Sequence, residues 1–408
     1  MIDPDRLLHN LRQLREFRRC GSGVVRRCLS PIDMESRHWL VERMQDAGLD
    51  ARIDGVANVL GRSVNPGKAL LLGSHSDTQP TGGWLDGALG VIYGIEVAQA
   101  LHENASTRHL AIDVACWADE ESHYLGLMGS RSFCGELSEA EIDSASNAEG
   151  HKLRAALAEC QLDQRPRLHL EPERYRGYIE AHIEQGPWLE LERRRIGVVT
   201  SIVGMCDLEL SFCGQQNHAG TTPMHLRRDA AMALFEFVQV LNQAFAEIRS
   251  EHTVWTIGRL ELTPNAPSIV PGVAECNLQF RDPEQARVER LQHRVFELIE
   301  DFNRSHHIVA SVAVRDDSAR AAAMDEDIQA ALAQAAEHCA PGAWRHMPSG
   351  AAHDAQVLAR HLPAGMLFIP SIGGVSHDFA EDSHEADIVL GCEVLARAAL
   401  HLLQQQPA

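Results

Sequence analysis

The sequence predicts an α/β protein whose main domain is interrupted by a smaller α+β domain. An apolar run, Ala69–Leu72, lies between two glycines and leads into His75, as expected of a short strand buried in an α/β sheet. Residues 207–316 follow the order strand, helix, strand, strand, helix, strand, which is typical of a small antiparallel sheet with two helices on one face. Helix and strand patterns resume after this stretch. We therefore expect a main domain from residues 1–206 and 317–408, with 207–316 inserted.

The first sixty residues predict two helices followed by two short strands. Asp3 and Pro4 suit the N-cap and first turn of a helix that continues to Phe17. Gly21 and Gly23 lack the third glycine of a dinucleotide-binding loop, so a plain loop is expected there. The second helix is expected over residues 30–47 and the strands within residues 50–62.

The strand that begins at Ala69 ends in residues suited to metal binding. His75 stands at its carboxyl end, the edge where open α/β sheets bind ligands, and Asp86 precedes a helical pattern over residues 88–103. Imidazole and carboxylate groups are ligands for Zn²⁺ or Mn²⁺. Asp77 can accept the second ring N–H of His75 and fix its tautomer. The structural alternative is a hydrogen-bonded histidine and a helix-capping aspartate.

Two later strands also lead into acidic or histidine residues. A strand over residues 109–116 is followed by Asp119, Glu120 and Glu121, which would repel one another unless a cation lies there. A solvated acidic turn is the alternative. The alternation of residues 178–183 predicts a strand that places Glu180, His182 and Glu184 on one face, followed by a helix over 188–194.

The remaining elements complete the two predicted domains. The inserted domain is expected to contain strands at 208–212, 253–262, 273–281 and 309–314, with helices at 228–248 and 282–305. The resumed main domain is expected to contain helices at 325–338 and 386–404 and a strand at 366–369.

Composition limits the possible partners and compartments. The formal net charge of −20 argues against nucleic acid and anionic membranes, which attract basic patches. Ten scattered cysteines without a C-x-x-C pair are typical of reduced thiols in a cytoplasmic protein. The N-terminus lacks a signal-peptide profile, and no apolar run is long enough to span a bilayer, so a soluble protein is expected.

Seven motifs follow one another along the chain in a characteristic order. Together they resemble the amidase/hydantoinase/carbamoylase branch of the M20 di-metal peptidase family, over nearly the whole chain. The motifs are Gly73-Ser-His-Ser-Asp-Thr, Leu85-Asp-Gly-Ala-Leu-Gly, Asp119-Glu-Glu, His182-Ile-Glu-Gln-Gly-Pro, Asn217-His-Ala-Gly-Thr-Thr-Pro-Met, Ser349-Gly-Ala-Ala-His-Asp-Ala and Gly374-Val-Ser-His.

The resemblance implies an aminopeptidase-like catalytic domain with an inserted lid that forms a homodimer. It also implies two divalent metal ions per subunit, zinc or manganese. Asp86 would bridge the metals, because two close cations need a shared carboxylate, and Glu120 would be the general base for an activated water. The terminal ligands would be His75, Glu121, His182 and His377, in a pairing that stays open, with His384 as a weaker alternative to His377.

The resemblance further implies a set of substrate contacts. Gln185 would hold a ureido or amide group, and His218, reaching the site of the partner subunit, would stabilise an oxyanion. Arg281 would pair with the substrate carboxylate, which Gly350 and His353 would also line. Ser268 stands at a substrate-binding position where this branch usually has asparagine, and Ser-His-Tyr at 122–124 and Ala352 depart from the pattern too.

The implied activity is hydrolysis of a ureido or amide C–N bond in a small carboxylate substrate. An N-carbamoyl-L-amino acid or an allantoate-type ureido acid fits best. An N-acyl-amino acid deacylase or dipeptidase of the same fold is the alternative that Ser268 leaves open. A non-catalytic metal-binding protein is disfavoured because Glu120 is present. The substrate, its side chain, the metal and the state of the lid stay undetermined by the sequence.

Overall fold

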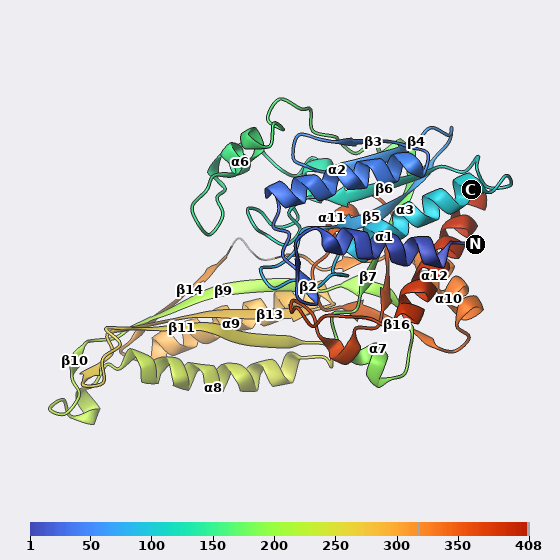
Figure 1. Cartoon of the computed structure of the whole chain (residues 1–408). Helices are drawn as coiled ribbons and strands as arrows, with labels where there is room; N and C mark the ends of the chain where they lie inside the picture. The colour runs from blue at the N-terminus through green and yellow to red at the C-terminus, as the bar shows by residue number, and fades with distance from the viewer. Residues whose placement is uncertain (316–318, 406–408) are drawn as a thin grey trace. The chain divides into compact units, whose positions relative to one another are not determined.

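The computed structural model describes residues 1–315 and 319–405, which form two compact units (Figure 1). Unit 1 comprises Met1–Thr200 and Ala323–Ala408, and unit 2 is the segment Ser201–Ala322 between them. The first division thus lies a few residues before the predicted one at 206/207. The second predicted boundary, 316/317, lies outside the described residues. The predicted mixed α/β class is confirmed.

Unit 1 is built on a nine-stranded mixed sheet whose centre is parallel. Its strand order is β15-β8-β17-β7-β5-β6-β4-β3, with β16 paired to β8. The central strands β17, β7, β5 and β6 run parallel to one another, so their carboxyl ends meet at one edge. These strands are β5 (Ala69–His75), β6 (Ile112–Trp117), β7 (Tyr175–Ile183) and β17 (Ala364–Ile369). The outer strands are β3 (Leu49–Ile53), β4 (Val59–Ser63), β8 (Ile196–Ile202), β15 (Ala322–Ala323) and β16 (Trp344–Ser349).

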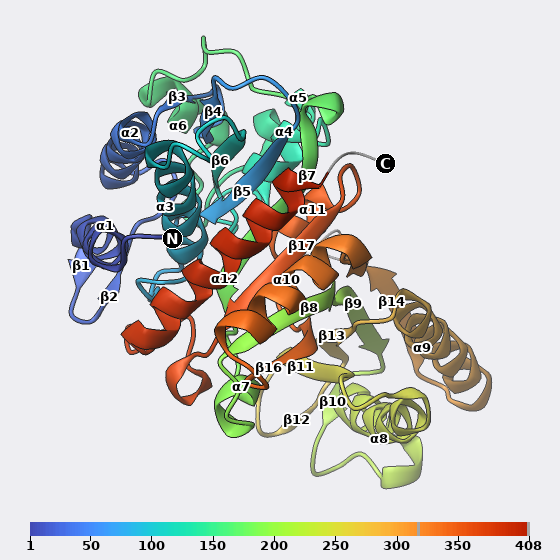
Figure 2. The same cartoon turned by 90° about the vertical axis from the view of Figure 1, so that its right-hand side faces the viewer.

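Helices on this sheet bury its central strands. Helices α3, α10 and α12 pack on β5, β6, β7 and β17 (Figure 2), and α4 and α11 contact β6, β7 and β17. All side chains of β5, β6 and β17 are buried, which is why their sequences are nearly continuous apolar runs. These helices are α3 (Ala88–Glu103), α4 (Met128–Phe133), α10 (Glu326–Cys339), α11 (Asp354–Leu358) and α12 (Glu385–Gln404).

The remaining elements of unit 1 begin at the expected caps. The side chain of Asp3 accepts backbone N–H groups at the start of α1, and that of Ser30 does so at the start of α2. The loop predicted at Gly21–Gly23 is the tight turn of a short hairpin between β1 and β2, with Gly21 at φ +60° and Gly23 already in β2. These elements are α1 (Pro4–Glu16), β1 (Arg19–Cys20), β2 (Gly23–Val24), α2 (Pro31–Asp46), α5 (Glu139–Ser144), α6 (Leu153–Glu159) and α7 (Trp188–Leu191).

Unit 2 is a four-stranded antiparallel sheet with two helices. The strand order is β11-β13-β9-β14, and α8 and α9 pack on the apolar face. This is the predicted βαββαβ arrangement. Its elements are β9 (Gly204–Cys213), α8 (Ala230–Ile248), β11 (Val254–Thr263), β13 (Val273–Asp282), α9 (Gln285–Ser305) and β14 (Val309–Val314), with β10 (Asn217–His218) and β12 (Ile269–Val270) paired separately.

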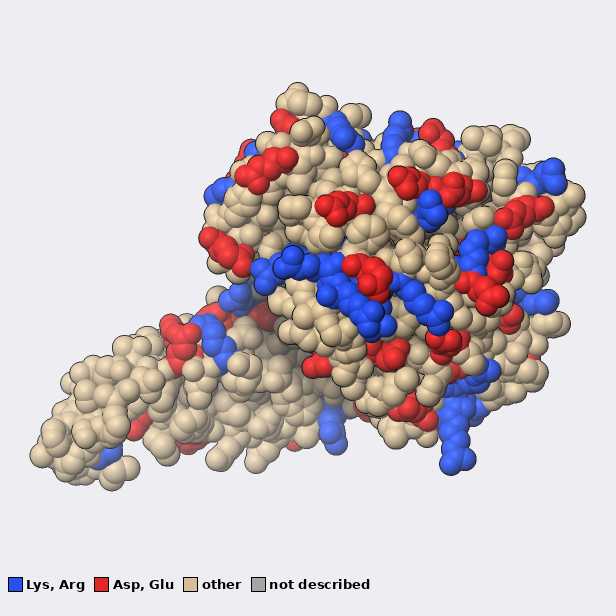
Figure 3. Space-filling view, in the orientation of Figure 1, with Lys and Arg blue, Asp and Glu red and all other residues tan. Residues whose placement is uncertain are grey.

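The length of the helices, the charge of the surface and the state of the cysteines bear on the expectations from composition. No helix among the described residues has both the length and the apolar character that a membrane crossing requires. On the face in Figure 3, basic side chains of unit 1 lie among acidic ones. All ten cysteines are free thiols.

Candidate metal centre

Four loops meet at the edge where the parallel strands of unit 1 end. They follow β5, β6, β7 and β17, and they carry most of the polar residues that the sequence singled out. In the sheet, His75 pairs with Trp117, so the ends of β5 and β6 are level. The topology therefore gathers residues far apart in the sequence, as expected for the ligand-binding edge of an α/β sheet.

Asp86 is the residue around which these loops converge. One carboxylate oxygen lies 3.1 Å from Nε2 of His182 and 3.7 Å from Nε2 of His75. The other oxygen lies 3.3 Å from Nε2 of His377, which is 3.8 Å from a carboxylate oxygen of Glu121. Two groups capable of holding a metal ion result, and Asp86 belongs to both: His75, Asp86 and His182, and Asp86, Glu121 and His377.

The histidine tautomers leave lone pairs aimed at Asp86. Nδ1 of His75 donates to the backbone carbonyl of Asp77 at 3.0 Å, and Nδ1 of His182 donates to that of Ile183 at 2.9 Å. Because a carbonyl only accepts, the neutral rings carry their protons on Nδ1 and leave Nε2 unprotonated. With Nε2 unprotonated, His182 accepts the backbone N–H of Gly87 at 3.1 Å, while a carboxylate oxygen of Asp86 lies 3.1 Å from the same nitrogen. Attraction between Nε2 and this oxygen needs a positive charge, either a proton on Nε2, which then donates to Asp86, or a cation beside the pair.

The centre also buries more carboxylate charge than its positively charged side chains can balance. Burial raises the pKa of Glu120 and Glu121 well above the ordinary carboxyl range, and neighbouring carboxylates raise it further. Burial acts in the same direction on Asp86, but hydrogen bonds from His182 and His377 outweigh it and hold its pKa well below the ordinary range. Oε1 of Glu121 is buried and has no hydrogen-bond partner among the residues that the structure describes. This donor set therefore fits divalent cations, which take nitrogen and carboxylate ligands.

Two glycines provide the space that this arrangement needs. A Cβ at Gly87, whose φ is +64°, would lie 2.4 Å from Nε2 of His75. A Cβ at Gly83 would lie 1.8 Å from Oε1 of Glu381. Gly87 therefore lets the chain turn past His75, and Gly83 leaves room for the carboxylate of Glu381.

Glu120 lies beside the ligands without belonging to either group. Its carboxylate is 3.6 Å from Nε2 of His75, and its side chain is 10% exposed. Asp119, with φ +56°, precedes it and accepts the N–H groups of His123, Tyr124 and Leu125, which fixes the turn. Glu120 is therefore held where it can reach a molecule bound at the centre.

The other predicted site residues of unit 1 lie close to the same loops. Nε2 of Gln185 is 3.3 Å from both carboxylate oxygens of Asp86, and Gln185 has φ +57°. The ring of His353 lies with its centroid 4.6 Å from that of His182 and is buried. Gly350 is exposed, one residue after β16. His384 belongs to neither metal group and forms the N-cap of α12.

Three predicted site residues belong to unit 2. His218, in β10, and Ser268, beside β12, are exposed neighbours, because His218 pairs with Ile269. Nδ1 of His218 accepts the N–H groups of Gly220 and Thr221 at 3.0 and 3.1 Å, which leaves Nε2 as the protonated nitrogen of the neutral ring. Arg281 lies near the end of β13, and its guanidinium group donates to Oε1 of Gln279.

Asp77 accepts the second ring N–H of His75, as predicted, but through its backbone carbonyl and not through its carboxylate. The nearest carboxylate oxygen is 3.9 Å from Nδ1, which bonds the backbone carbonyl instead. The carboxylate faces the buried Arg37 at 3.8 Å and accepts the N–H of Glu121 at 3.2 Å. Arg37 lies forty residues earlier in the chain, so the spacing of His75 and Asp77 could not reveal it.

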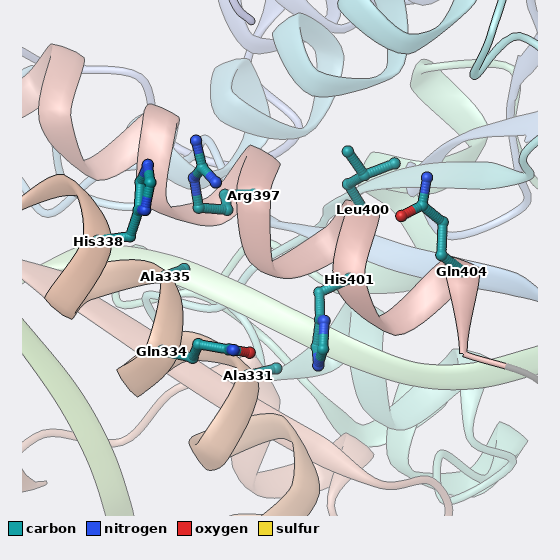
Figure 4. Close-up of a pocket in the computed structure, with 8 residues that line it drawn as sticks. All are labelled: Ala331, Gln334, Ala335, His338, Arg397, Leu400, His401 and Gln404. Carbon is teal, nitrogen blue, oxygen red and sulfur yellow. The ribbon is translucent and has the colours of Figure 1, made fainter.

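Sequence reasoning also missed two buried acids, Asp354 and Glu381. Asp354 directly follows His353, and Glu381 follows His377 by four residues. Asp354 stands in a segment of small residues, whereas Glu381 has the acidic neighbours Asp378 and Asp382, so no local signal distinguished it. A separate groove of about 240 Å³ between α10 and α12, lined by His338, Arg397 and His401 among others (Figure 4), contains none of the predicted site residues.

The sequence from β5 to α12 matches a known family. Residues 71–401 match peptidase family M20/M25/M40, a segment that includes all five predicted metal ligands. The chain belongs to this family. The family prediction from the motifs is thereby confirmed.

Relatives within the M20 family are similar along their whole length. N-carbamoyl-L-amino acid amidohydrolase of Geobacillus stearothermophilus is 32% identical, over 99% of this chain and 100% of that protein. Allantoate amidohydrolase of Escherichia coli (strain K12) is 30% identical, over 95% of this chain and 94% of that protein. The crystal structure of an amidase (hydantoinase/carbamoylase family) from Burkholderia phymatum is 51% identical and has a TM-score of 0.93, covering 99% of this chain and 98% of that one.

Proposed function

We propose that this M20 family member is a metal-dependent amidohydrolase that cleaves a ureido or amide C–N bond in a small carboxylate substrate. The substrate class is an N-carbamoyl-L-amino acid or an allantoate-type ureido acid, in keeping with the names of the similar proteins. The observation that carries the proposal is the pair of ligand groups that share Asp86 beside Glu120. Ions at these groups, two per subunit and zinc or manganese, would activate water and polarise the carbonyl oxygen.

Each residue of the centre has a defined task in this reaction. The cations would be held by His75, Glu121, His182 and His377. The carboxylate of Asp86 belongs to both ligand groups and would bind at both. Glu120 accepts a proton from the attacking water and delivers it to the leaving nitrogen, which departs as an amine or as ammonia. The position of Glu120, 3.6 Å from Nε2 of His75 and outside both ligand groups, suits both halves of this cycle.

The substrate contacts divide between the units. Gln185 and His353 of unit 1, together with Gly350, are proposed to orient the substrate. On unit 2, Nε2–H of His218 is proposed to donate to the developing oxyanion, and Arg281 to bind the carboxylate with two parallel hydrogen bonds. Ser268 beside His218 offers a hydroxyl where an amide is usual, so it is the position expected to alter substrate preference.

The geometry of unit 2 supports a homodimer in which subunits share sites. Val273, at the start of β13, pairs with Cys213, and β10 with His218 lies beyond that end. Arg281 pairs with Met205 eight residues further along the same strand. At 3.3 Å per residue these ends are about 26 Å apart, far longer than a small ureido acid. A site that uses both His218 and Arg281 therefore needs two copies of the chain.

The surface of unit 2 also suits self-association. Large apolar side chains are exposed on α8 and on the edge strand β11, which offers unpaired backbone groups. Figure 3 shows few charged side chains over this part of unit 2. The exposed residues are Met232, Phe235, Val240, Val254 and Leu260. Unit 1 (Met1–Thr200 and Ala323–Ala408) is thus the proposed catalytic domain, and unit 2 (Ser201–Ala322) is the proposed lid and dimerisation domain. The free thiols support a reducing, cytoplasmic setting.

A substrate panel tests the activity. Purified enzyme is incubated with N-carbamoyl-L-amino acids, allantoate, N-acetyl-L-amino acids and dipeptides, before and after chelation, and ammonia and free amino acid are measured. We expect ammonia from a ureido substrate, loss of activity on chelation, and recovery with Zn²⁺ or Mn²⁺. Cleavage of N-acetyl substrates or dipeptides alone would favour the deacylase or dipeptidase alternative. Activity that survives complete metal removal would contradict the proposal.

Mixing two inactive variants tests the shared site. In a heterodimer of His218→Ala and Glu120→Gln, one site contains Glu120 of the first chain and His218 of the second. Reassembly of equal amounts should restore up to about a quarter of the wild-type rate, since half the dimers are mixed and each has one intact site. No recovery after proven subunit exchange would show that both residues act within one chain.

A further inference from the structure

Glu381 connects two of the loops that carry the proposed metal ligands. It lies between His377 and α12, and it is 1% exposed. One carboxylate oxygen accepts the backbone N–H of Asp86 at 3.1 Å, and the other accepts the hydroxyl of Ser376 at 2.8 Å. A single side chain therefore ties the backbone at Asp86 to the residue that precedes His377.

These contacts form part of a closed ring of hydrogen bonds. The hydroxyl of Ser376 accepts Nε2–H of Gln185 at 3.1 Å, and the same Nε2 lies 3.3 Å from the Asp86 carboxylate. The ring runs from Asp86 through Glu381, Ser376 and Gln185 back to Asp86. It joins the loops after β5, β7 and β17, which supply Asp86, Gln185 and His377.

Neighbouring contacts hold the same two segments together. Nε1–H of Trp84 donates to the carboxylate of Asp382 at 3.1 Å, and the hydroxyl of Thr81 donates to the carbonyl of His377 at 3.1 Å. At Gly83 the carboxylate of Glu381 occupies the space of a side chain, since a Cβ there would lie 1.8 Å from Oε1. The 81–86 and 377–382 segments are thus shaped around the Glu381 carboxylate.

The chemistry of this carboxylate is unusual for a purely structural residue. Among the residues that the structure describes, no arginine or lysine forms an ion pair with Glu381, although its side chain is buried beside Asp86. Burying a carboxylate next to another acid costs free energy unless cations lie nearby. The carboxylate of Glu381 accepts hydrogen bonds from the backbone N–H of Asp86 and from Ser376, the residue before His377.

We propose that Glu381 is a positioning residue for the metal centre, holding Asp86 and His377 at the separation that the second ligand group needs. This inference rests on the proposed metal-dependent function. Residues that orient metal ligands in this way commonly change metal affinity 10- to 100-fold when mutated. An ion at Asp86, Glu121 and His377 would be affected most, because the two loops joined by Glu381 supply Asp86 and His377 to that group.

Metal retention measures this role directly. Wild type, Glu381→Ala and Glu381→Gln are dialysed against graded concentrations of a zinc chelator, and bound zinc per chain is measured by elemental analysis. Glu381→Ala should lose zinc at roughly 10- to 100-fold lower chelator concentration. Glu381→Gln should stay within about threefold of wild type, because its amide can accept from Asp86 and donate to Ser376.

Two further variants keep the test decisive if Glu381→Ala folds poorly. Ser376→Ala removes only one arm of the ring and should weaken retention by a smaller factor. Gly83→Ala displaces the carboxylate, so combining it with Glu381→Ala should add little to either change, a non-additivity expected of groups in contact. Glu96→Gln is the control: Glu96 is a buried acid on α3 that accepts the N–H of Asp3 at 2.7 Å and pairs with Arg6, and it belongs to neither metal group. It should lower thermal stability without changing zinc retention.

The outcomes separate this inference from the proposed function. If wild type binds neither zinc nor manganese, the metal centre is wrong. If wild type holds zinc and Glu381→Ala, Ser376→Ala and Gly83→Ala all retain it within twofold, Glu381 has no positioning role. A fall in thermal stability alone, equal to that of Glu96→Gln, would likewise show that Glu381 only stabilises the fold.

Discussion

Buried acids occur at strand ends in both units, but their surroundings differ. In unit 2, Asp282 ends β13 and is fully satisfied: its carboxylate accepts the N–H of Glu284 and the side chains of Arg287, Ser250 and Thr253. Burial raises its pKa, but these hydrogen bonds outweigh that effect and lower it below the ordinary value of 3.8. In unit 1, the acids around Asp86 face one another and histidine lone pairs.

The difference distinguishes an acid that stabilises the fold from acids suited to binding a metal ion and transferring protons. Asp282 obtains its cation and donors from its own chain, so its burial is compensated at once. Burial raises the pKa values of Glu120 and Glu121, and one buried oxygen of Glu121 has no hydrogen-bond partner within residues 1–315 and 319–405. Such a cluster is stable only with positive charge from outside the chain or with bound protons. Single substitutions at the proposed site and at Asp282 test this contrast.

Asp86→Asn should have the largest effect. The amide keeps the shape of the side chain but removes the charge shared by both ligand groups, so both ions should bind weakly. We expect turnover to fall at least about a thousandfold, since several kcal/mol of metal assistance is lost. Elemental analysis and ammonia release measure the two effects. Retention of both ions would show that Asp86 does not hold the centre together.

Glu120→Gln should abolish proton transfer while leaving the ligands intact. We expect turnover to fall by roughly 10²- to 10⁴-fold with an unchanged metal content, because a general base contributes about that much. Asp282→Asn serves as the comparison, with full turnover per folded molecule. Turnover near the wild-type rate in Glu120→Gln would remove the assigned base.

Arg281→Lys should act on substrate binding more than on turnover. Lysine keeps the charge but loses the two parallel donors of guanidinium, so we expect KM for a carboxylate substrate to rise about 10-fold with a smaller change in kcat. Steady-state kinetics with a substrate and its carboxamide analogue would separate the contributions. An equal KM for acid and carboxamide in the wild type would contradict the carboxylate contact.

Asp282→Asn should have the smallest effect, confined to stability. We expect a loss of about 1–3 kcal/mol in the free energy of unfolding at neutral pH, because buried donors lose a charged acceptor. Since the folded-state pKa of Asp282 is lowered, its contribution is complete above the ordinary value of 3.8 and disappears as the pH falls through the folded value. Denaturation of wild type and variant should therefore converge in acid. A constant difference down to low pH would contradict the stabilising role of this carboxylate.

The sequence was most informative where periodicity and motif coincided. Ala69–Leu72 predicted β5, and the acids after Trp117 predicted a cluster, because a buried parallel strand and its carboxyl end leave strong local signals. The structure brings the five predicted ligands into two groups around Asp86. Strands β8 and β16 were missed, since short pairings of this kind depend on distant partners and not on local pattern.

The part of the site that the sequence did not predict lies in long-range contacts. Arg37 faces Asp77 across forty residues, and Glu381 reaches the N–H of Asp86 across nearly three hundred. Neither residue stands in a motif that specifies its partner. Side-chain spacing reveals which residues share a strand end or a helix face, whereas the supports behind them come from chain segments that meet only in the folded protein.

A carboxylate that belongs to two ligand groups has a thermodynamic consequence. If cations occupy both groups, the effect of the first on the charge and orientation of Asp86 would change the affinity for the second, and by reciprocity the second would change the affinity for the first by the same factor. Loading of the centre would then be cooperative in one sense or the other, and single-ion affinities measured separately could not be summed to describe the filled state.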